Sequence, residues 1–207
     1  MSQQSQWEKL KKELCEILTR SGALKFGVFT LAGGQLSPYY IDLRIIPSFP
    51  EAFSKVEKLY LEVSMNDLNL KNIDRIAGIP TAGIPFASVL AFSLNKPFLY
   101  IRKDATHGRV RKVEGLLNPG EAVLIVDDLI TTGRTILAAA DSIRSEGGVV
   151  SDVLVLIDRQ EGGRAALEAQ GIRLHYLILM KDAAKLLYDM GVIDKEQRNT
   201  ILSQTVS

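Results

Sequence analysis

Residues 121–136 read EAVLIVDDLITTGRTI, and this stretch decides the fold. Five apolar residues, 122–126, make a strand-sized run that leads directly into Asp127 and Asp128. A Thr-Thr-Gly turn at 131–133 follows, and the residues after it have the pattern of a helix. A continuous apolar strand that turns directly into a helix is typical of a parallel sheet covered on both faces. The stretch therefore predicts an α/β fold.

The same alternation of short apolar runs and helical stretches continues on both sides of this segment. The runs are rich in Ile, Leu and Val, and the expected strands are 73–79, 98–101, 122–126, 153–157 and 174–179. The expected helices between them are 83–94, 134–146 and 161–170. Together they predict an α/β core over about 70–180, with a central, mainly parallel sheet flanked by helices. Ligands bind at the carboxyl ends of such strands, so the chemistry is expected there.

The N-terminal third has a different pattern. Its expected elements are helices at about 6–20 and 53–63 and extended segments at 28–31 and 39–43. The helices follow from apolar residues spaced one helical turn apart, and the extended segments flank a Gly-Gly turn. No repeat or long linker divides the chain. We therefore expect a single domain over 1–207, in which about 20–45 and one C-terminal helix form a hood over the core.

The composition narrows the class of protein. The 207 residues carry 25 Lys and Arg against 24 Asp and Glu, a formal net charge of +1. This balance disfavours a protein that coats nucleic acid or an anionic membrane by bulk charge. Cys15 is the only cysteine in the sequence, which excludes an internal disulfide and a cysteine-based zinc site. There is no bilayer-length apolar segment and no export signal, so we expect a cytoplasmic protein without a membrane partner.

The turn after the strand has the chemistry of an anion-binding cup. Gly133 lets the backbone approach a phosphate closely, and the amides at the start of the following helix point at the same place. Thr131, Thr132 and Thr135 add hydroxyl donors, and the helix dipole favours negative charge there. The segment therefore predicts a phosphate site.

The two aspartates need a different partner, because carboxylates repel phosphate. Asp127 and Asp128 fit the hydroxyls of a sugar that carries the phosphate, or a metal that bridges to it. Two other interpretations are open for such a pair: a cap on the following helix, or a phospho-acceptor pocket. The threonines and the glycine beside the pair favour the sugar phosphate. There is no G-x-x-x-x-G-K-[ST] motif and no G-x-G-x-x-G after a strand, which disfavours other nucleotide folds.

The run VLIVDDLITTG at 123–133 resembles the phosphoribosyl pyrophosphate (PRPP) signature of type I phosphoribosyltransferases. The resemblance implies that fold, with the aspartates on the ribose hydroxyls and 131–135 on the 5′-phosphate. It also implies Mg²⁺ as cofactor, carried mainly by PRPP, with Asp127 or Asp128 as the candidate protein ligand. The implied PRPP-binding residues are Arg102, Lys103, His107, Asp127, Asp128, Leu129, Ile130, Thr131, Thr132, Gly133, Arg134 and Thr135.

Three further segments, 23–44, 102–115 and 157–163, resemble the hood, the mobile loop and the base-binding turn of orotate phosphoribosyltransferases. Orotate is a flat anionic pyrimidine, which favours an aromatic neighbour and a planar cation. The candidate orotate-binding residues are Tyr39, Tyr40, Thr131 and Arg159. Strand alternation places the two tyrosines on opposite faces, so one of them serves ordinary packing. For Arg159, the alternative is a surface ion pair with Asp158 or Glu161.

The loop 102–115 supplies the expected catalytic residues, Lys103 and His107. Its cations would stabilise the departing pyrophosphate, and a closed loop would keep water from PRPP. The resemblance implies a homodimer in which this loop acts across the interface. Compared with the pattern R-K-x-x-K-x-H-G, the loop here is one residue shorter and lacks the middle lysine, and Ala32 stands where many relatives have lysine. Two replacements for the middle lysine stay open: Lys103, or the basic cluster from Arg109 to Lys112. A further turn, GIPTAGIP at 78–85, resembles the pyrophosphate loop.

The resemblance implies an enzyme that joins orotate to PRPP and releases orotidine 5′-monophosphate and pyrophosphate. Two alternatives stay open. One is a phosphoribosyltransferase for another base, which the hood and the 157–163 turn disfavour. The other is a PRPP-sensing regulator that binds nucleic acid through the basic loop, which the balanced charge and the lack of a nucleic-acid module disfavour. We expect no nucleic-acid partner.

Overall fold

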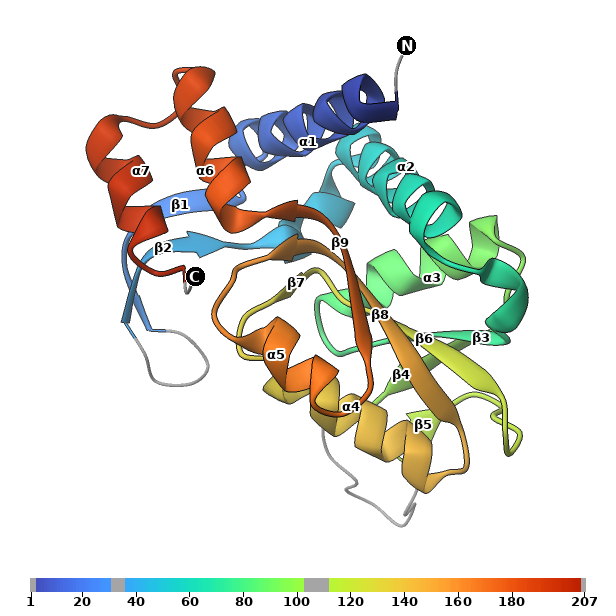
Figure 1. Cartoon of the computed structure of the whole chain (residues 1–207). Coiled ribbons are helices and arrows are strands. Elements are labelled where there is room, and N and C mark those ends of the chain that lie inside the picture. The colour runs from blue at the N-terminus through green and yellow to red at the C-terminus, as the bar shows by residue number, and fades with distance from the viewer. Residues whose placement is uncertain (1–2, 31–35, 103–111, 206–207) are drawn as a thin grey trace.

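A mainly parallel sheet forms the centre of the molecule (Figure 1). The computed structural model describes residues 3–30, 36–102 and 112–205. The helices are α1 (Gln3–Arg20), η1 (Leu43–Ser48), α2 (Pro50–Asp67), η2 (Leu70–Asn72), α3 (Gly83–Ser93), α4 (Arg134–Ser145), α5 (Gly163–Glu168), α6 (Met180–Asp189) and α7 (Lys195–Leu202). The strands are β1 (Leu24–Thr30), β2 (Leu36–Ile41), β3 (Arg75–Gly78), β4 (Phe98–Ile101), β5 (Val113–Glu114), β6 (Ala122–Val126), β7 (Leu129–Ile130), β8 (Val149–Asp158) and β9 (Arg173–Leu179).

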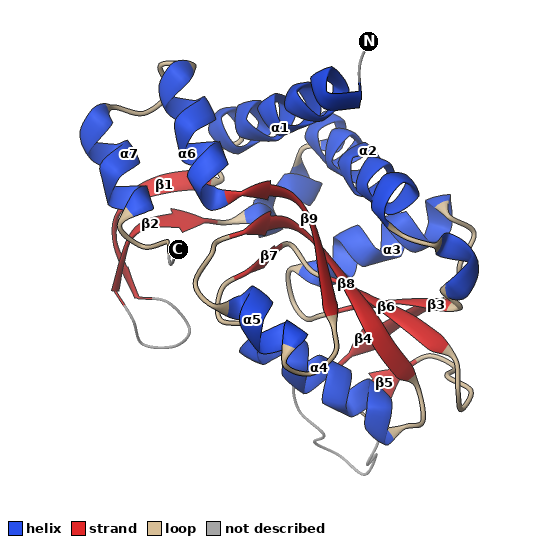
Figure 2. Cartoon of the chain, in the orientation of Figure 1, coloured by secondary structure: helices blue, strands red, loops and turns tan. Residues whose placement is uncertain are grey.

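The strand order of the central sheet is β5-β4-β3-β6-β8, and both β7 and β9 also pair with β8. Every pair is parallel except β4 with β5 (Figure 2). Strand β7 continues the line of β6 along β8 after a break at Asp127 and Asp128. The predicted α/β architecture is confirmed, and the aspartates lie at the carboxyl end of β6, where sequence reasoning placed the chemistry.

The sheet separates two hydrophobic cores. Alternate residues of each strand face opposite sides: Ile76 and Leu124 belong to the first core, Ala77 and Ile125 to the second. Helices α1, α2, α3 and α6 supply the first core, and α4 and α5 the second. Residues of both cores are almost fully withdrawn from solvent, so both faces of the sheet contribute apolar burial to stability.

The hood region is a β-hairpin with helices beside it. Strands β1 and β2 form a separate antiparallel sheet, and α7 contacts β2 (Figure 1). The C-terminal segment contains two helices, not the one expected, because Asp194 begins α7 with a reciprocal capping box to Gln197. The expected strand 39–43 was wrong at its end. Asp42 accepts a hydrogen bond from the amide of Arg44, and this cap starts η1.

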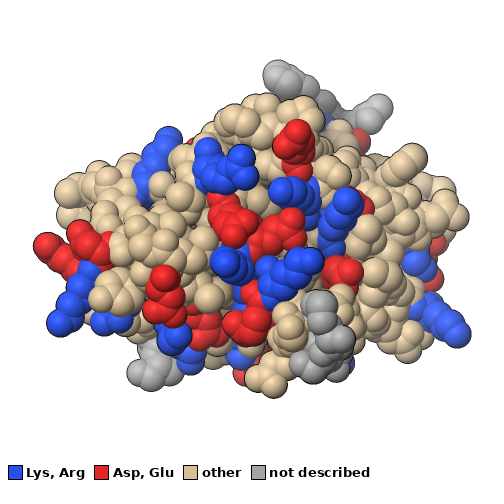
Figure 3. Space-filling model, turned by 90° about the horizontal axis from the view of Figure 1, so that it is seen from above, with Lys and Arg blue, Asp and Glu red and all other residues tan. Residues whose placement is uncertain are grey.

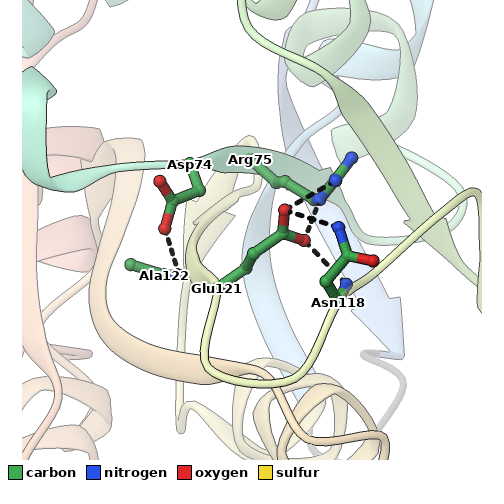
Figure 4. A network of polar contacts seen from close by, with 5 residues as sticks. All are labelled: Asp74, Arg75, Asn118, Glu121 and Ala122. Carbon is green, nitrogen blue, oxygen red and sulfur yellow. Dashed lines mark hydrogen bonds and ion pairs between the residues drawn. The ribbon is translucent and has the colours of Figure 1, made fainter.

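An ion-pair network ties the strands together at the amino end of the sheet (Figure 4). The Arg75 guanidinium donates twice to Glu121, once to each carboxylate oxygen. Both the amide and the side chain of Asn118 also donate to Glu121, at 2.7 and 3.0 Å. Beside them, the amide of Ala122 donates to Asp74 at 2.8 Å. These contacts fix the start of β6 against β3, so that the two strands end together at the opposite edge.

Figure 3 shows the molecule from above relative to Figure 1, and on this face Lys and Arg are interspersed with Asp and Glu. On helices α1 and α6, Lys11 pairs with Glu8 at 2.9 Å and Lys185 with Asp189 at 2.8 Å. This face therefore lacks the one-signed basic stripe typical of nucleic-acid-binding surfaces. Among the helices of the described residues, none combines the length and the apolar character that a membrane span requires.

Candidate functional site

Asp127 and Asp128 lie where the ladder between β6 and β8 becomes irregular. The amide of Asp127 donates to the carbonyl of Leu154 at 3.1 Å. In a regular parallel ladder the amide of Leu156 would then donate to the carbonyl of Asp127. It donates instead to Asp128, at 3.1 Å. The irregularity interrupts the ladder at the carboxyl edge of the sheet and lets the backbone turn there.

A cleft of about 210 Å³ opens beside these two residues. It is lined by Pro80, Thr81, Ala82, Asp127, Asp128, Leu129, Ile130, Thr131, Gly133, Arg134, Thr135 and Ile136. The cleft thus joins the acidic pair, the threonine-glycine turn and part of the 78–85 turn, in which a cis peptide bond links Pro80 and Thr81. Of the expected residues in this turn, Thr132 does not line the cleft.

Gly133 lines the cleft and is the residue that precedes α4. It has a left-handed conformation with φ of 77°, and a Cβ there would lie 3.2 Å from the carbonyl oxygen of Gly163. In the described part of the chain, no side chain caps the first turn of α4. The amides and the positive end of the helix dipole therefore face the cleft, as an anion site requires.

Burial makes both carboxyl groups of the acidic pair reluctant to ionise. Burial, together with the neighbouring carboxyl of Asp128, raises the pKa of Asp127 well above its ordinary value. Burial also raises the pKa of Asp128 to about 6, although the Arg44 guanidinium opposes this rise. Such a pair gains from a ligand whose hydroxyl groups donate hydrogen bonds to it, because these bonds replace the lost hydration.

Arg159 lies next to this cleft, at the end of β8. Its amide donates to the carbonyl of Ile130 at 3.0 Å, and its side chain is only 2% exposed. The guanidinium pairs with Glu161 at 2.8 Å and stacks on the Tyr39 ring at 4.5 Å. The alternative of an ion pair with Glu161 is thus partly confirmed, but the pair is buried and does not lie at the surface.

Two polar atoms of this cluster have unused hydrogen-bonding capacity. The Nε atom of Arg159 and the hydroxyl of Tyr39 are buried without a well-formed hydrogen bond in the described part of the chain. The Tyr40 ring has a different environment, stacked on Phe29 at 5.5 Å, and its hydroxyl accepts from Arg44 at 2.8 Å. The two tyrosines therefore face opposite sides of β2, as strand alternation predicts. Neither they nor Arg159 line the cleft beside the acidic pair.

The basic loop is anchored by a short antiparallel ladder. Tyr100 pairs with Glu114 and Ile101 with Val113, which brings the two ends of the loop together. Arg102 donates to Glu114 at 3.1 Å, at the same carboxyl edge as the acidic pair. The expected catalytic residues Lys103 and His107 lie outside the described residues.

Sequence reasoning missed two residues that contact or influence the acidic pair. The hydroxyl of Tyr60, on α2, donates to the carbonyl of Asp127 at 2.8 Å. The Nε atom of Arg44, in η1, donates to the Asp42 carboxylate at 2.7 Å, and the charge of this guanidinium partly offsets the rise in the pKa of Asp128. Neither had a local signal, because each lies on an element remote in sequence from 121–136.

Comparison with known proteins agrees with this geometry. The family model of the phosphoribosyl transferase domain matches residues 45–168. An orotate phosphoribosyltransferase of Cenarchaeum symbiosum is 41% identical over 91% of this chain and 94% of its own length. The crystal structure of orotate phosphoribosyltransferase from Aeropyrum pernix has 35% identity and a TM-score of 0.73, covering 86% of this chain and 99% of that one.

A solved structure with a ligand adds to this comparison. The orotate phosphoribosyltransferase of Mycobacterium tuberculosis, in complex with PRPP, has 27% identity and a TM-score of 0.66. It covers 84% of this chain and 98% of that one. The model match, the identities over nearly whole chains and the shared α/β architecture agree with one another. The chain therefore has the type I phosphoribosyltransferase fold and belongs to the family of orotate phosphoribosyltransferases.

Proposed function

We propose that the protein transfers the phosphoribosyl group of PRPP to orotate, giving orotidine 5′-monophosphate and pyrophosphate. The observation that carries this proposal is the cleft in which the carboxyl groups of Asp127 and Asp128 adjoin the start of α4, where the described residues provide no side-chain cap. A sugar phosphate offers what each part needs: hydroxyl donors for the carboxylates and an anion for the helix start. The family relationship supplies the reaction class.

Within this proposal, the residues of the cleft bind and orient PRPP. Asp127 and Asp128 accept hydrogen bonds from the ribose hydroxyls, while Thr131, Gly133 and Thr135 seat the 5′-phosphate. The adjoining turn at 78–85 lies on the side where pyrophosphate leaves. Transfer makes a bond from a ring nitrogen of orotate to the anomeric carbon as the bond to pyrophosphate breaks, and the proton of that nitrogen is released to water. Holding both reactants at this carbon accounts for much of the rate.

Mg²⁺ remains a proposed cofactor, and the residues fit an ion that arrives with PRPP. Among the described residues, no group of three or more His, Cys, Asp or Glu side chains is gathered as a metal site. Magnesium commonly keeps several waters and binds one or two carboxylates together with substrate phosphates. Asp127 or Asp128 would provide that carboxylate contact. When bound, the ion would neutralise charge on the pyrophosphate.

Arg159 is the proposed contact for orotate. Its planar guanidinium is buried against the Tyr39 ring, and its Nε atom has unused donor capacity among the described residues. A carboxylate or carbonyl edge of orotate satisfies this donor at the same place where the Tyr39 hydroxyl has no well-formed hydrogen bond to the described residues. Glu161 holds the guanidinium in place. A purine lacks the carboxylate that this cation favours.

A homodimer is also proposed, with loop 102–115 acting in the site of the partner subunit. Apolar surface supports it: Phe92 at the end of α3 is 88% exposed, and Tyr100 on β4 is 39% exposed. Tyr100 stacks on Phe98 and adjoins the anchored end of the loop. Sedimentation of the wild-type chain and of Phe92→Asp tests this, and a monomeric wild type contradicts it.

A direct assay tests the proposed reaction. The chain is incubated with PRPP, Mg²⁺ and orotate, and the loss of orotate absorbance is followed, with uracil, adenine and hypoxanthine in parallel reactions. We expect consumption of orotate alone. Consumption of another base in place of orotate supports a different phosphoribosyltransferase. Binding of PRPP without consumption of any base supports the sensing role.

A further inference from the structure

We propose that Tyr60 is a positioning residue for the acidic pair: its hydroxyl holds the backbone turn that aims Asp127 and Asp128 at the sugar. Tyr60 lies on α2, outside every segment that resembles a binding motif, and its hydroxyl donates to the carbonyl of Asp127 at 2.8 Å. The inference rests on the proposed function, because it assumes that the pair binds ribose hydroxyls.

The irregular ladder explains why this hydrogen bond is needed. Since the amide of Leu156 donates to Asp128, the carbonyl of Asp127 has no donor on β8. Strand β3 ends at Gly78, opposite Val126, and therefore offers no paired residue beside Asp127. A buried carbonyl without a partner costs about 1–3 kcal/mol. The hydroxyl of Tyr60 provides the donor, so the turned backbone is stable only with this side chain.

The surroundings of Tyr60 make it a fixed donor. The side chain is fully buried, and its ring packs against Phe86 of α3 at a centroid distance of 5.6 Å. Burial, with the carboxyl groups of Asp128 and Asp127 nearby, raises the pKa of Tyr60 well above its ordinary value. The hydroxyl therefore keeps its proton over the working pH range.

Close packing against α3 also restricts the pair. A Cβ at Gly83, the first residue of α3, would lie 2.6 Å from the carbonyl oxygen of Val126 and 2.9 Å from Oδ1 of Asp127. The same Oδ1 accepts from the amide of Asp128 at 3.0 Å. The segment 126–128 is thus packed against α3, and α2 adds the hydrogen bond from the hydroxyl of Tyr60.

Tyr60→Phe tests the role, since it removes the hydroxyl and keeps the packed ring. The probes are ribose 5-phosphate, which contacts both the pair and the phosphate cup, and inorganic phosphate, which needs only the cup. By titration calorimetry we expect the Kd of ribose 5-phosphate to rise about fivefold, and that of inorganic phosphate to stay within about twofold of wild type. The Kd of PRPP should rise with that of ribose 5-phosphate.

Val63→Ala is the matched control, because Val63 is also fully buried on α2 but has no polar side-chain atom that could bond to the pair. It destabilises the fold and should leave both Kd values unchanged. The temperature is chosen so that thermal denaturation shows both variants folded. If Tyr60→Phe leaves ribose 5-phosphate binding unchanged, or weakens both probes equally, the positioning role is overturned. If wild type does not consume orotate but the probes still separate, the role holds and the proposed reaction fails.

Discussion

A side chain proposed to bind the ligand can also lower the stability of the fold. Asp128 shows this most clearly, because burial raises its pKa to about 6. An unfolded chain releases the same proton near pH 4. The fold therefore disfavours the ionised form of Asp128 that the proposed ligand contact needs, which is a common arrangement at functional sites.

Asp128→Asn should separate these two properties. The asparagine can still accept from the amide of Leu129, as Asp128 does at 2.8 Å, but carries no charge. We expect the free energy of unfolding at pH 7 to rise by an amount on the order of 2 kcal/mol. We expect PRPP binding to weaken at least tenfold. Denaturant titration and calorimetry measure the two effects, and loss of both stability and binding would instead indicate a structural cap.

Arg159→Lys tests the contact with orotate. Lysine keeps the positive charge beside Glu161 but loses the planar fork. We expect the KM for orotate to rise about tenfold, while the Kd for PRPP stays near wild type. Arg164→Lys is the control, since Arg164 also pairs with a buried carboxylate, Asp158, but belongs to α5. Equal effects of the two substitutions on orotate would exclude a specific role for Arg159.

At this scale the sequence predicted side chains from local motifs and could not predict their partners. Asp127 and Asp128 were predicted because a strand, an acidic pair and a Thr-Gly turn are contiguous in the chain. Tyr60 was missed because 67 residues separate it from Asp127. A periodic helix pattern assigns such a tyrosine to the core, and only the fold shows that its hydroxyl ends at the site.

Among the elements, the start of α4 requires a glycine at the position that precedes the helix. Gly133 has a left-handed backbone and would carry a Cβ against Gly163. Gly120, with φ of 86°, has the same kind of backbone but nothing within 4 Å of such a Cβ. Both alanine variants should lose about 1 kcal/mol of stability from backbone strain. Only Gly133→Ala should also weaken PRPP binding, by about tenfold, as measured by calorimetry. Equal PRPP binding in both variants would contradict the proposal that the turn at 131–135 binds the 5′-phosphate.

The elements themselves were predicted best where one physical signal dominates. Strands β4 and β6 have the expected bounds, since each is a short apolar run between turns. The expected strand 153–157 extends to Val149–Asp158, because its added first half pairs with β6 and β9 at a more polar end of the sheet. The two-residue strands β5 and β7 had no signal of their own; their pairing with β4 and β8 alone makes them strands.

At the scale of the whole molecule, the proposed binding residues and a stabilising ion-pair network lie at opposite ends of one sheet. The carboxyl edge holds the acidic pair and its raised pKa values, whereas the amino edge holds Glu121 with Arg75 and Asn118. The five residues of β6 separate the two ends by roughly 17 Å. Substitutions at the amino edge should therefore change stability and leave kcat unchanged.

Stability as a function of pH should show the two ends with opposite signs. The Arg75 guanidinium and the Asn118 amide lower the pKa of Glu121 to about 2, below its unfolded value of roughly 4.3. The contribution of Glu121 is thus fully present above about pH 4.5 and is lost as the pH falls through about 2. Glu121→Gln should lower the Tm at pH 7, and the difference in Tm from wild type should disappear as the pH falls from about 4.5 to 2.

Asp128→Asn should raise the Tm at pH 7, because the folded pKa of Asp128 is raised. The difference in Tm from wild type should disappear as the pH falls from about 6 to 4. Thermal melts of wild type and both variants from pH 2 to 8 measure the two windows. If the two variants changed the Tm at pH 7 in the same direction, this would contradict the division of the sheet into a stabilising edge and a proposed binding edge.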